Sequence, residues 1–174
     1  MSKAFDQAFQ IVVGHEGGFS DNAADSGNWT GGAVGKGALR GTKFGISAAS
    51  YPTLNIRDLT LDDARTIYRR DYWDPMLCDD WTPGLALIVF DAAINNGISR
   101  ATRFLQAAVG VHVDGIIGPV THQAVLAADA AAVAAELHAR RIFFMASLST
   151  WATFGLGWSR RLARLPAQAA TMST

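Results

Sequence analysis

GNWTGGAVGKGALRGTKFG, residues 27–45, is the stretch that separates this 174-residue chain from a plain helical bundle. It holds seven glycines and few side chains large enough to build a core. Because glycine is unfavourable inside helices, this composition predicts a β-ribbon or a long ordered loop. The sequence around it has helical periodicity. We therefore expect a mainly α fold with one small glycine-rich β-ribbon or loop near residues 27–46.

Apolar side chains recur at helical spacing on both sides of this stretch. Near the start of the chain, Phe5, Phe9 and Val12 lie on one stripe, and we expect this helix to end at the glycine pair 17–18. The next helix should begin after Thr60, because Asp63 follows three residues later in a variant of the capping box. From this helix onward, periodicity predicts helices at 61–73, 83–94, 100–109, 119–126, 130–148 and 158–165. Pro83 should open the second of these helices, and Ser99 and Asp129 should cap the third and the fifth.

Charge and cysteine content exclude several classes of protein. Residues 1–99 hold eight basic and twelve acidic residues, and residues 100–174 hold seven and three. This small basic excess is far below the dense patch that nucleic-acid binding needs, so we expect no nucleic-acid partner. A single cysteine, Cys78, rules out an intramolecular disulfide and a thiolate zinc cluster.

Export and membrane signals are also missing from the sequence. The start of the chain, MSKAFDQAFQ, has no apolar region of a signal peptide, and no apolar run is long enough to span a bilayer. We therefore expect synthesis in the cytoplasm and no stable membrane insertion.

Two carboxylates near the glycine-rich stretch are candidates for acid and base chemistry. Glu16 stands in His15-Glu16-Gly17-Gly18, at the expected end of the first helix. The negative end of a helix dipole and an apolar neighbourhood both favour a protonated carboxyl, which is the state of a glycosidase's general acid. Asp25 follows nine residues later and could activate water or support positive charge on a sugar. Its alternative role is that of an Asx turn or a helix cap.

A family resemblance extends this interpretation over nearly the whole chain. EGGFSDNAADSGNWTGG (16–32) with GTKFGISAASYP (41–52) closely resembles the N-terminal motif of glycoside hydrolase family 108, N-acetylmuramidases of phages and bacteria. LTLDDARTIYRRDYWDP (59–75) and FDAAINNG (90–97) look like the helices that follow in that family. FLQAAVGVHVDGIIGPVT (104–121) resembles the peptidoglycan-binding segment commonly attached to it. The resemblance implies a lysozyme-like fold with a catalytic lobe at 1–98 and a helical peptidoglycan-binding lobe at 99–174, which could also form one compact domain.

The resemblance also implies catalytic roles. Glu16 matches the family's catalytic acid, while Asp25 and Thr42 correspond by motif order to the aspartate and threonine of phage-type lysozymes. Asp25 would orient water or support positive charge, and the hydroxyl of Thr42 would hold that water. Residues 28–40 are an insertion between these two, so their convergence depends on the course of that segment. Thr42 could instead be a strand residue with a cross-strand bond.

Substrate contacts are expected from three further residues. Tyr72 and Trp73 follow a helix that the resemblance places beside the cleft, and aromatic rings suit sugars, although one of the two is expected to fill the core. Of the neighbouring Asn95 and Asn96, one is expected to cap its helix and the other to face the cleft. Asp91, within an apolar run, needs a hydrogen-bond partner if it is buried.

The expected reaction is cleavage of the β-1,4 bond between N-acetylmuramic acid and N-acetylglucosamine, without metal or organic cofactor. The expected partner is the peptidoglycan glycan strand, the expected state is a monomer, and the expected source is a phage or prophage that lyses its host and releases the enzyme to the wall. Two alternatives stay open. One is a non-catalytic wall-binding module that relies on residues 104–121. The other is a zinc amidase, which the sequence disfavours because it shows no ligand cluster.

Overall fold

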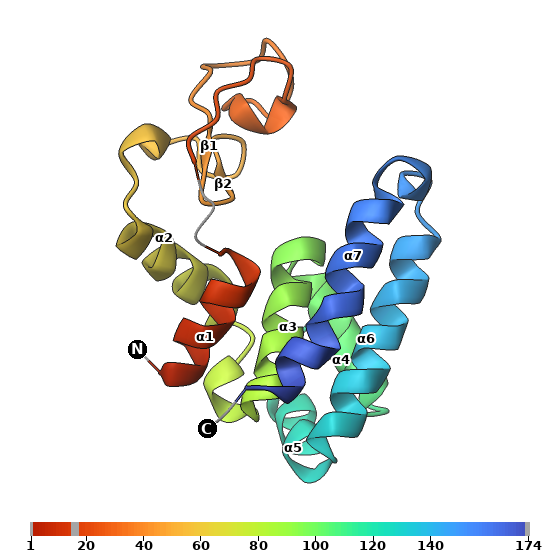
Figure 1. Cartoon of the computed structure of the whole chain (residues 1–174). Helices are drawn as coiled ribbons and strands as arrows, with labels where there is room; N and C mark the ends of the chain where they lie inside the picture. The colour runs from red at the N-terminus through yellow and green to blue at the C-terminus, as the bar shows by residue number, and fades with distance from the viewer. Residues whose placement is uncertain (1, 15–17, 173–174) are drawn as a thin grey trace. The chain divides into compact units, whose positions relative to one another are not determined.

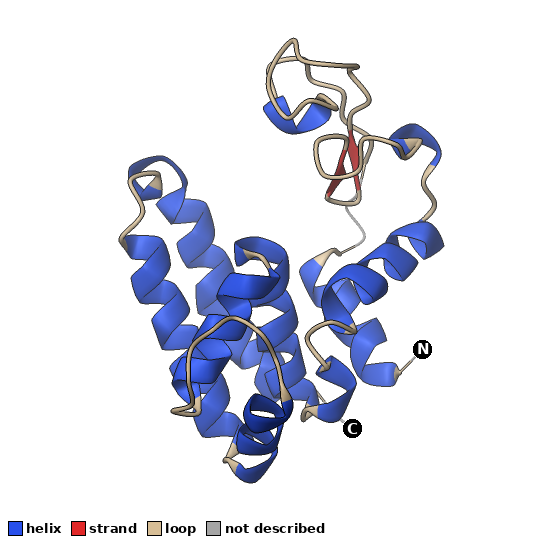
Figure 2. Cartoon of the chain, turned by 180° about the vertical axis from the view of Figure 1, so that it is seen from behind, coloured by secondary structure: helices blue, strands red, loops and turns tan. Residues whose placement is uncertain are grey.

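The computed structural model describes residues 2–14 and 18–172. Within these residues it has seven α-helices, one pair of short strands, three short 3-10 helices and one π-helical turn (Figure 1). The chain divides into two compact units, one formed by residues 9–68 and the other by the residues before Phe9 together with those from Arg69 onward. The expected mainly α fold with a small β-ribbon is confirmed, as the blue helices and short red strands of Figure 2 show.

The 9–68 unit holds the glycine-rich stretch. Strand β1 (Thr42–Lys43) pairs antiparallel with β2 (Ile46–Ser47), and Ser20 forms an additional bridge to Thr42. Helix α2 (Leu61–Tyr68) closes this unit, and its Tyr68 ring meets that of Phe9 edge-on at 5.7 Å between centroids.

The helical unit is built around α3 (Pro83–Asn96), whose residues from Leu85 to Ala93 are all buried. Helices α4 (Ile98–Ala108), α6 (Ala130–Ala146) and α7 (Trp151–Ala170) pack on it, and α5 (Pro119–Ala127) packs on α6. Figures 1 and 2 show α6 and α7 side by side as an antiparallel pair. A helix that is apolar on every side, as α3 is, needs such a complete cover of neighbours.

Two of the predicted caps, the Thr60–Asp63 box and Asp129, occupy their expected places, whereas Ser99 lies inside α4, which Gly97 precedes. The Asp63 carboxylate accepts from the backbone N–H of Thr60 at 2.9 Å, and the Asp63 N–H donates to the Thr60 hydroxyl at 3.1 Å. Asp129 caps α6 by accepting from the N–H of Ala132 at 2.8 Å. Pro83 begins α3, where its missing N–H needs no helical partner.

Two helices, α1 and α7, differ clearly in length from the prediction. Helix α1 (Lys3–Val12) ends earlier than expected, because Gly14 adopts a left-handed φ of 69°. Helix α7 is longer than the predicted 158–165, since it continues through Gly155 and Pro166. Pro166 has no N–H to donate to the carbonyl of Leu162. Nε2 of His138 on α6 donates to that carbonyl instead, at 3.1 Å.

The compact units have other boundaries than the two lobes expected from the sequence. Residues 69–98 contain α3, which belongs to the helical unit and packs there against α4, α6 and α7. The expected division into a catalytic lobe and a peptidoglycan-binding lobe at residue 98 therefore stays a prediction.

Candidate active site

Asp25 lies at the start of a short 3-10 helix, Ser26–Asn28, in the 9–68 unit. Its Oδ1 accepts from the backbone N–H of Gly27 at 2.9 Å, while the residue as a whole is exposed. This contact is the turn-capping role that the sequence left open as an alternative. A carboxylate has further acceptor positions, so the cap leaves Asp25 able to receive a hydrogen bond or a proton from solvent.

Thr42 lies in β1, half-buried between two neighbouring segments. Its backbone exchanges a pair of hydrogen bonds with Ser20, of 2.8 Å and 2.9 Å, and it stands opposite Ser47 in the β-ribbon. The backbone of Thr42 therefore forms the cross-strand hydrogen bonds that the sequence left open as an alternative. Its side chain makes a separate contact, since the hydroxyl donates to Oδ1 of Asn28 at 2.7 Å.

Asn28 joins the Asp25 turn to the strand that holds Thr42. Its side chain is fully buried, and its Nδ2 donates to the carbonyl of Asn22 at 3.0 Å. Its own carbonyl accepts from the N–H groups of Arg40 and Gly41, at 2.9 Å and 3.0 Å. Sequence reasoning did not single out Asn28. The one signal that could have indicated Asn28 is its place in the sequence, just after the predicted Asp25 turn and at the start of the insertion.

The inserted segment 28–40 leaves this junction and returns to it. Trp29 and Leu39 form an antiparallel bridge, and the indole N–H of Trp29 donates to the carbonyl of Ala23 at 2.9 Å. Gly41 then has a φ of 82°, and a Cβ there would lie 2.6 Å from the carbonyl oxygen of Ser20, so only glycine fits. The structure thus brings the Asp25 turn and Thr42 together in one hydrogen-bonded assembly despite the insertion.

Glu16, the predicted general acid, lies outside the described residues. The helix whose dipole was expected to act on it ends at Val12 in the described part of the chain. Ser20, four residues after Glu16 in the sequence, is the residue that pairs with Thr42.

The two predicted aromatic contacts differ in burial. Trp73 is fully buried, with its ring edge-on to those of Phe5 and Phe90, each at 5.3 Å between centroids, and its indole N–H donates to Asp79 at 2.9 Å. A ring packed in this way has no face for a sugar, so Trp73 has the core role that the sequence allowed for one of the pair. Tyr72 is half-buried in the same one-turn π-helix, Arg69–Trp73.

The two asparagines at the end of α3 also differ. Asn96 is tied to α6, because its Oδ1 accepts from Nε of Arg141 at 2.7 Å. Asn95 is exposed and is the one of the pair whose position suits a ligand. The expected helix cap is not what Asn96 does, since its side-chain oxygen bonds to Arg141 of α6, and the expectation that the other asparagine faces the cleft stays a prediction.

Asp91 has the partners that its burial requires. Its Oδ2 accepts from Nη1 of the fully buried Arg141, and its Oδ1 accepts from Nε of Arg161 at 2.8 Å. Burial is the foremost cause that lowers the pKa of Arg141, and the charge of Asp91 opposes that effect. These bonds fasten α3 to α6 and α7, a structural role for Asp91.

The 9–68 unit also has a polar depression of about 440 Å³ that the sequence did not predict. Phe19, Arg40 and Asn55 are among its lining residues. The guanidinium of Arg57 lies over the Phe19 ring, 4.2 Å from its centroid, and forms an ion pair with Asp21 at 3.1 Å. Phe19, which lines the depression, and Asp21 both lie in the segment that directly precedes the Asp25 turn.

Neither a metal cluster nor a membrane span is found in the part of the chain that the structure describes. Within residues 2–14 and 18–172, no three His, Cys, Asp or Glu side chains gather as metal ligands would. No helix in these ranges is both long enough and apolar enough to cross a bilayer.

Comparison with known proteins assigns the sequence to a family. The profile described as Glycosyl hydrolase 108 matches residues 9–97, about half of the chain. The chain belongs to glycosyl hydrolase family 108. A second profile, described as a predicted peptidoglycan domain, matches residues 100–163.

A solved structure supports the same assignment for the family 108 chain. The structure of Brucella abortus SagA is 32% identical, with a TM-score of 0.78, over 95% of this chain and 93% of the other. No curated protein matches the sequence. Family 108 is a family of peptidoglycan muramidases, so this chain is a glycoside hydrolase with peptidoglycan as its partner.

Proposed function

We propose that this family 108 muramidase cleaves the glycan strand with Glu16 as general acid and with Asp25 and Thr42 holding the attacking water. The observation that carries the proposal is the Asn28 junction, which joins the Asp25 turn to the Thr42 hydroxyl. Glu16 is assigned from its motif alone. It would protonate the oxygen of the β-1,4 bond as that bond breaks.

The hydrogen bonds around Thr42 define how a water would be held. The Nδ2 group of Asn28 donates to Asn22, so its Oδ1 is the acceptor that faces Thr42. Because the single hydroxyl proton of Thr42 is donated to that acceptor, the hydroxyl oxygen can only accept a hydrogen bond from water. The Asp25 carboxylate is also an acceptor. A water that donates to both groups keeps its lone pairs free for the anomeric carbon, and Asp25 can take up the released proton.

Substrate binding is proposed for Tyr72 and Asn95. The half-buried Tyr72 ring offers a surface for sugar C–H groups, and the exposed amide of Asn95 offers donors and an acceptor for N-acetyl groups. Trp73 would act indirectly, by fixing the π-helix on which Tyr72 lies. The helical segment 100–163 would add affinity for the wall.

The biological setting is proposed as lysis of a bacterial host by a phage or prophage. In that setting a monomeric enzyme is made in the cytoplasm and released to the wall. The support is the resemblance to phage lysozymes, together with the match to the peptidoglycan domain.

The test is digestion of purified peptidoglycan, followed by mass spectrometry of the products. A muramidase leaves N-acetylmuramic acid at the new reducing end and frees no amino groups. We expect Glu16→Gln to retain the wild-type circular dichroism and to lose at least about two orders of magnitude of activity, as when a general acid is removed. Near wild-type turnover in Glu16→Gln would overturn its role, and release of stem peptides would point to an amidase instead.

A further inference from the structure

Helix α7 has a group of adjoining aromatic side chains near its start. Phe154 is 53% exposed, and the half-buried residues Trp151 and Trp158 lie beside it. Between ring centroids, Trp158 is 5.9 Å from Trp151 and 5.8 Å from Phe154. We call these three residues the aromatic cluster. Adjoining apolar side chains on a surface are typical of binding sites, whereas single exposed ones are common everywhere.

Gly155 fixes how the Trp151 ring lies. A Cβ at Gly155 would be 2.8 Å from Cδ2, 2.8 Å from Cε2 and 3.0 Å from Nε1 of the Trp151 indole. Because these distances are nearly equal, the face of the indole covers Gly155, and an alanine there would displace the ring. Trp151 and Trp158 thus give the cluster a packed base, on which Phe154 is the exposed ring.

The neighbouring helix α3 runs antiparallel to α7. Near the start of α3, the backbone of Gly84 lies against the carbonyl of Ala169, to which an added Cβ would be 2.8 Å. Farther along α3, Asp91 accepts from Nε of Arg161 at 2.8 Å. These two contacts fix the register of the helices, since each step forward in α3 corresponds to about one step back in α7.

This register places Asn95 at the level of the aromatic cluster. The exposed Asn95 follows Asp91 by one helical turn, on the same face of α3, and is level with Trp158 on α7. Helix α3 ends one residue later, at Asn96, short of the level of Phe154. Figures 1 and 2 show the α6–α7 pair continuing past this end of α3. Phe154 is exposed because the helix that packs on α7 stops before reaching it.

An exposed aromatic ring and an exposed amide together suit an N-acetyl sugar. One face of a sugar ring carries C–H groups, which pack on an aromatic ring such as that of Phe154. The Asn95 amide has two N–H donors and an oxygen acceptor, which match the carbonyl and the N–H of an acetamido group. Peptidoglycan strands are built of such sugars, and the peptidoglycan profile over residues 100–163 includes the whole aromatic cluster.

The charges of α7 complement the same polymer. This helix has three arginines and no acidic residue. Arg161 is paired with Asp91, whereas Arg160 and Arg164 are exposed. The carboxylates of peptidoglycan stem peptides are negative, so α7 attracts the wall over distances up to about 10 Å at ordinary salt concentrations.

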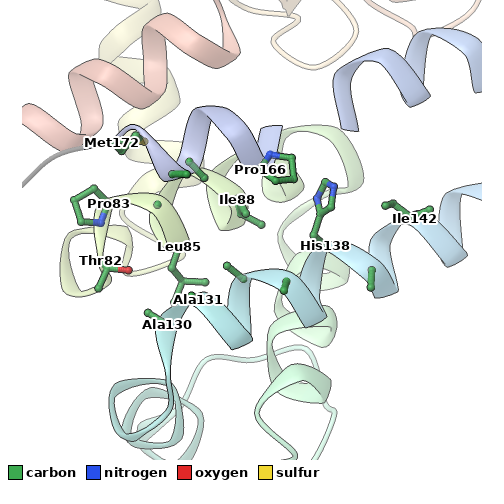
Figure 3. Close-up of a pocket in the computed structure, with 16 residues that line it drawn as sticks. Thr82, Pro83, Leu85, Ile88, Ala130, Ala131, His138, Ile142, Pro166 and Met172 are labelled. Carbon is green, nitrogen blue, oxygen red and sulfur yellow. The ribbon is translucent and has the colours of Figure 1, made fainter. Parts of the chain in front are cut away.

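The groove drawn in Figure 3 is a different part of the helical unit. From α7 it includes Pro166, Ala169 and Ala170, near the end of that helix, and the figure labels Pro166 and His138 there. The aromatic cluster is not part of its described lining, which holds no phenyl or indole ring. The sugar-binding chemistry therefore belongs to the start of α7.

We propose that the aromatic cluster and Asn95 form a site for the glycan strand, with Phe154 stacked on the face of an N-acetyl sugar and the Asn95 amide bonded to its acetamido group. The site anchors the enzyme on the wall through the helical unit, whereas Asp25 and Thr42 belong to the 9–68 unit. It rests on the proposed function only in the ligand-facing role of Asn95.

The first experiment measures sedimentation of the full chain with purified sacculi on ice. Phe154→Ala removes an exposed ring, so the fold should persist and the dissociation constant should rise about threefold to tenfold. Phe154→Tyr keeps the ring face and should bind like the wild type. Binding of Phe154→Ala at wild-type strength would overturn the site.

Phe143→Ala is the matched control. Phe143 is 77% exposed, lies on α6 within the same profile match, and follows Arg141 by two residues. Two residues turn a side chain by about 200° around a helix, so Phe143 points away from Asn96, the partner of Arg141. Phe143→Ala should therefore bind sacculi like the wild type. An equal loss in both alanine variants would mean unspecific apolar contact and would overturn the site.

A soluble probe tests the chemistry of the contact. In NMR titrations of the wild type with tri-N-acetylglucosamine, the side-chain amide of Asn95 and the backbone N–H of Gly157, which precedes Trp158, should shift. In Phe154→Ala these shifts should be smaller at equal probe concentration. Asn95 and Gly157 signals that do not respond to the probe would overturn the sugar assignment.

Two other outcomes are distinguished from these. Vesicles of phosphatidylglycerol and phosphatidylethanolamine test a lipid surface as the occupant. If Phe154→Ala weakens vesicle binding and leaves sacculus binding unchanged, the cluster binds lipid and the glycan site is overturned. Failure of the cleavage proposal is read from another variant, since Glu16→Gln would then still lyse walls, whatever the result for Phe154.

Discussion

The hydroxyl of Thr42 donates to the buried side-chain oxygen of Asn28 at 2.7 Å, across fourteen positions of the sequence. This bond fixes the direction of the hydroxyl proton and leaves the Thr42 oxygen as an acceptor. Because Asn28 also ends the 3-10 helix that Asp25 caps, one amide controls both groups proposed to hold water.

Replacing Asn28 should affect stability and activity together. Asn28→Ala leaves the Thr42 hydroxyl and the Asn22 carbonyl without partners, so we expect a loss of about 1–3 kcal/mol in the free energy of unfolding. Urea denaturation measures the stability and turbidity loss of cell walls measures the activity. Asn55→Ala is the control, because Asn55 is exposed in the same unit and its side-chain N–H donates to the nearby Asp58 at 2.7 Å. A fully stable and active Asn28→Ala would contradict the junction role.

Thr42 offers a test of the hydroxyl alone. Thr42→Val removes the hydroxyl and should lower kcat at least about tenfold, since the water loses one of its two acceptors. Thr42→Ser keeps the hydroxyl and should retain most of the activity. Steady-state kinetics on a soluble glycan substrate separates kcat from KM. If the valine and serine variants have equal kcat, the hydroxyl takes no part in the reaction.

Asp25→Asn separates the turn from the chemistry. The asparagine oxygen can still accept from the Gly27 N–H, so the thermal unfolding midpoint should hardly change. The lost carboxylate should lower kcat by about two orders of magnitude, as expected for a missing general base. Asp129→Asn makes the same change at the cap of α6 and should stay fully active. Wild-type turnover in Asp25→Asn would reduce Asp25 to a turn residue.

His138 should make the stability depend on pH. Burial lowers its pKa in the folded protein below 6.5, so below pH 6.5 the unfolded chain binds more protons than the folded one. This contribution to stability is complete above pH 6.5 and is lost as the pH falls toward the lower folded value. Urea denaturation at pH 7.5 and 5.5 measures the loss. In His138→Gln, whose amide can still donate to Leu162, the loss should be smaller, and an equal loss in that variant would exclude His138 as its source.

Local sequence signals predicted the elements well. The Thr60–Asp63 capping box, the Asp129 cap and Pro83 each lie where the pattern placed them, because caps and first-turn prolines act over a few residues. The expected length of α7 was wrong because a contact from a distant part of the sequence decides it. A proline such as Pro166 ordinarily ends a helix, but the side chain of His138 on α6 supplies the hydrogen-bond donor that Pro166 lacks.

The sequence by itself determined the mainly α fold, the glycine-rich ribbon and the family, since periodicity, composition and motifs are properties of neighbouring residues. Only the tertiary structure decided that the 28–40 insertion returns to its origin, that Trp73 is a core residue, and that Asn28 links Asp25 to Thr42. Hydrogen bonds between residues far apart in the sequence select one closed path for the inserted segment, and no local preference encodes them.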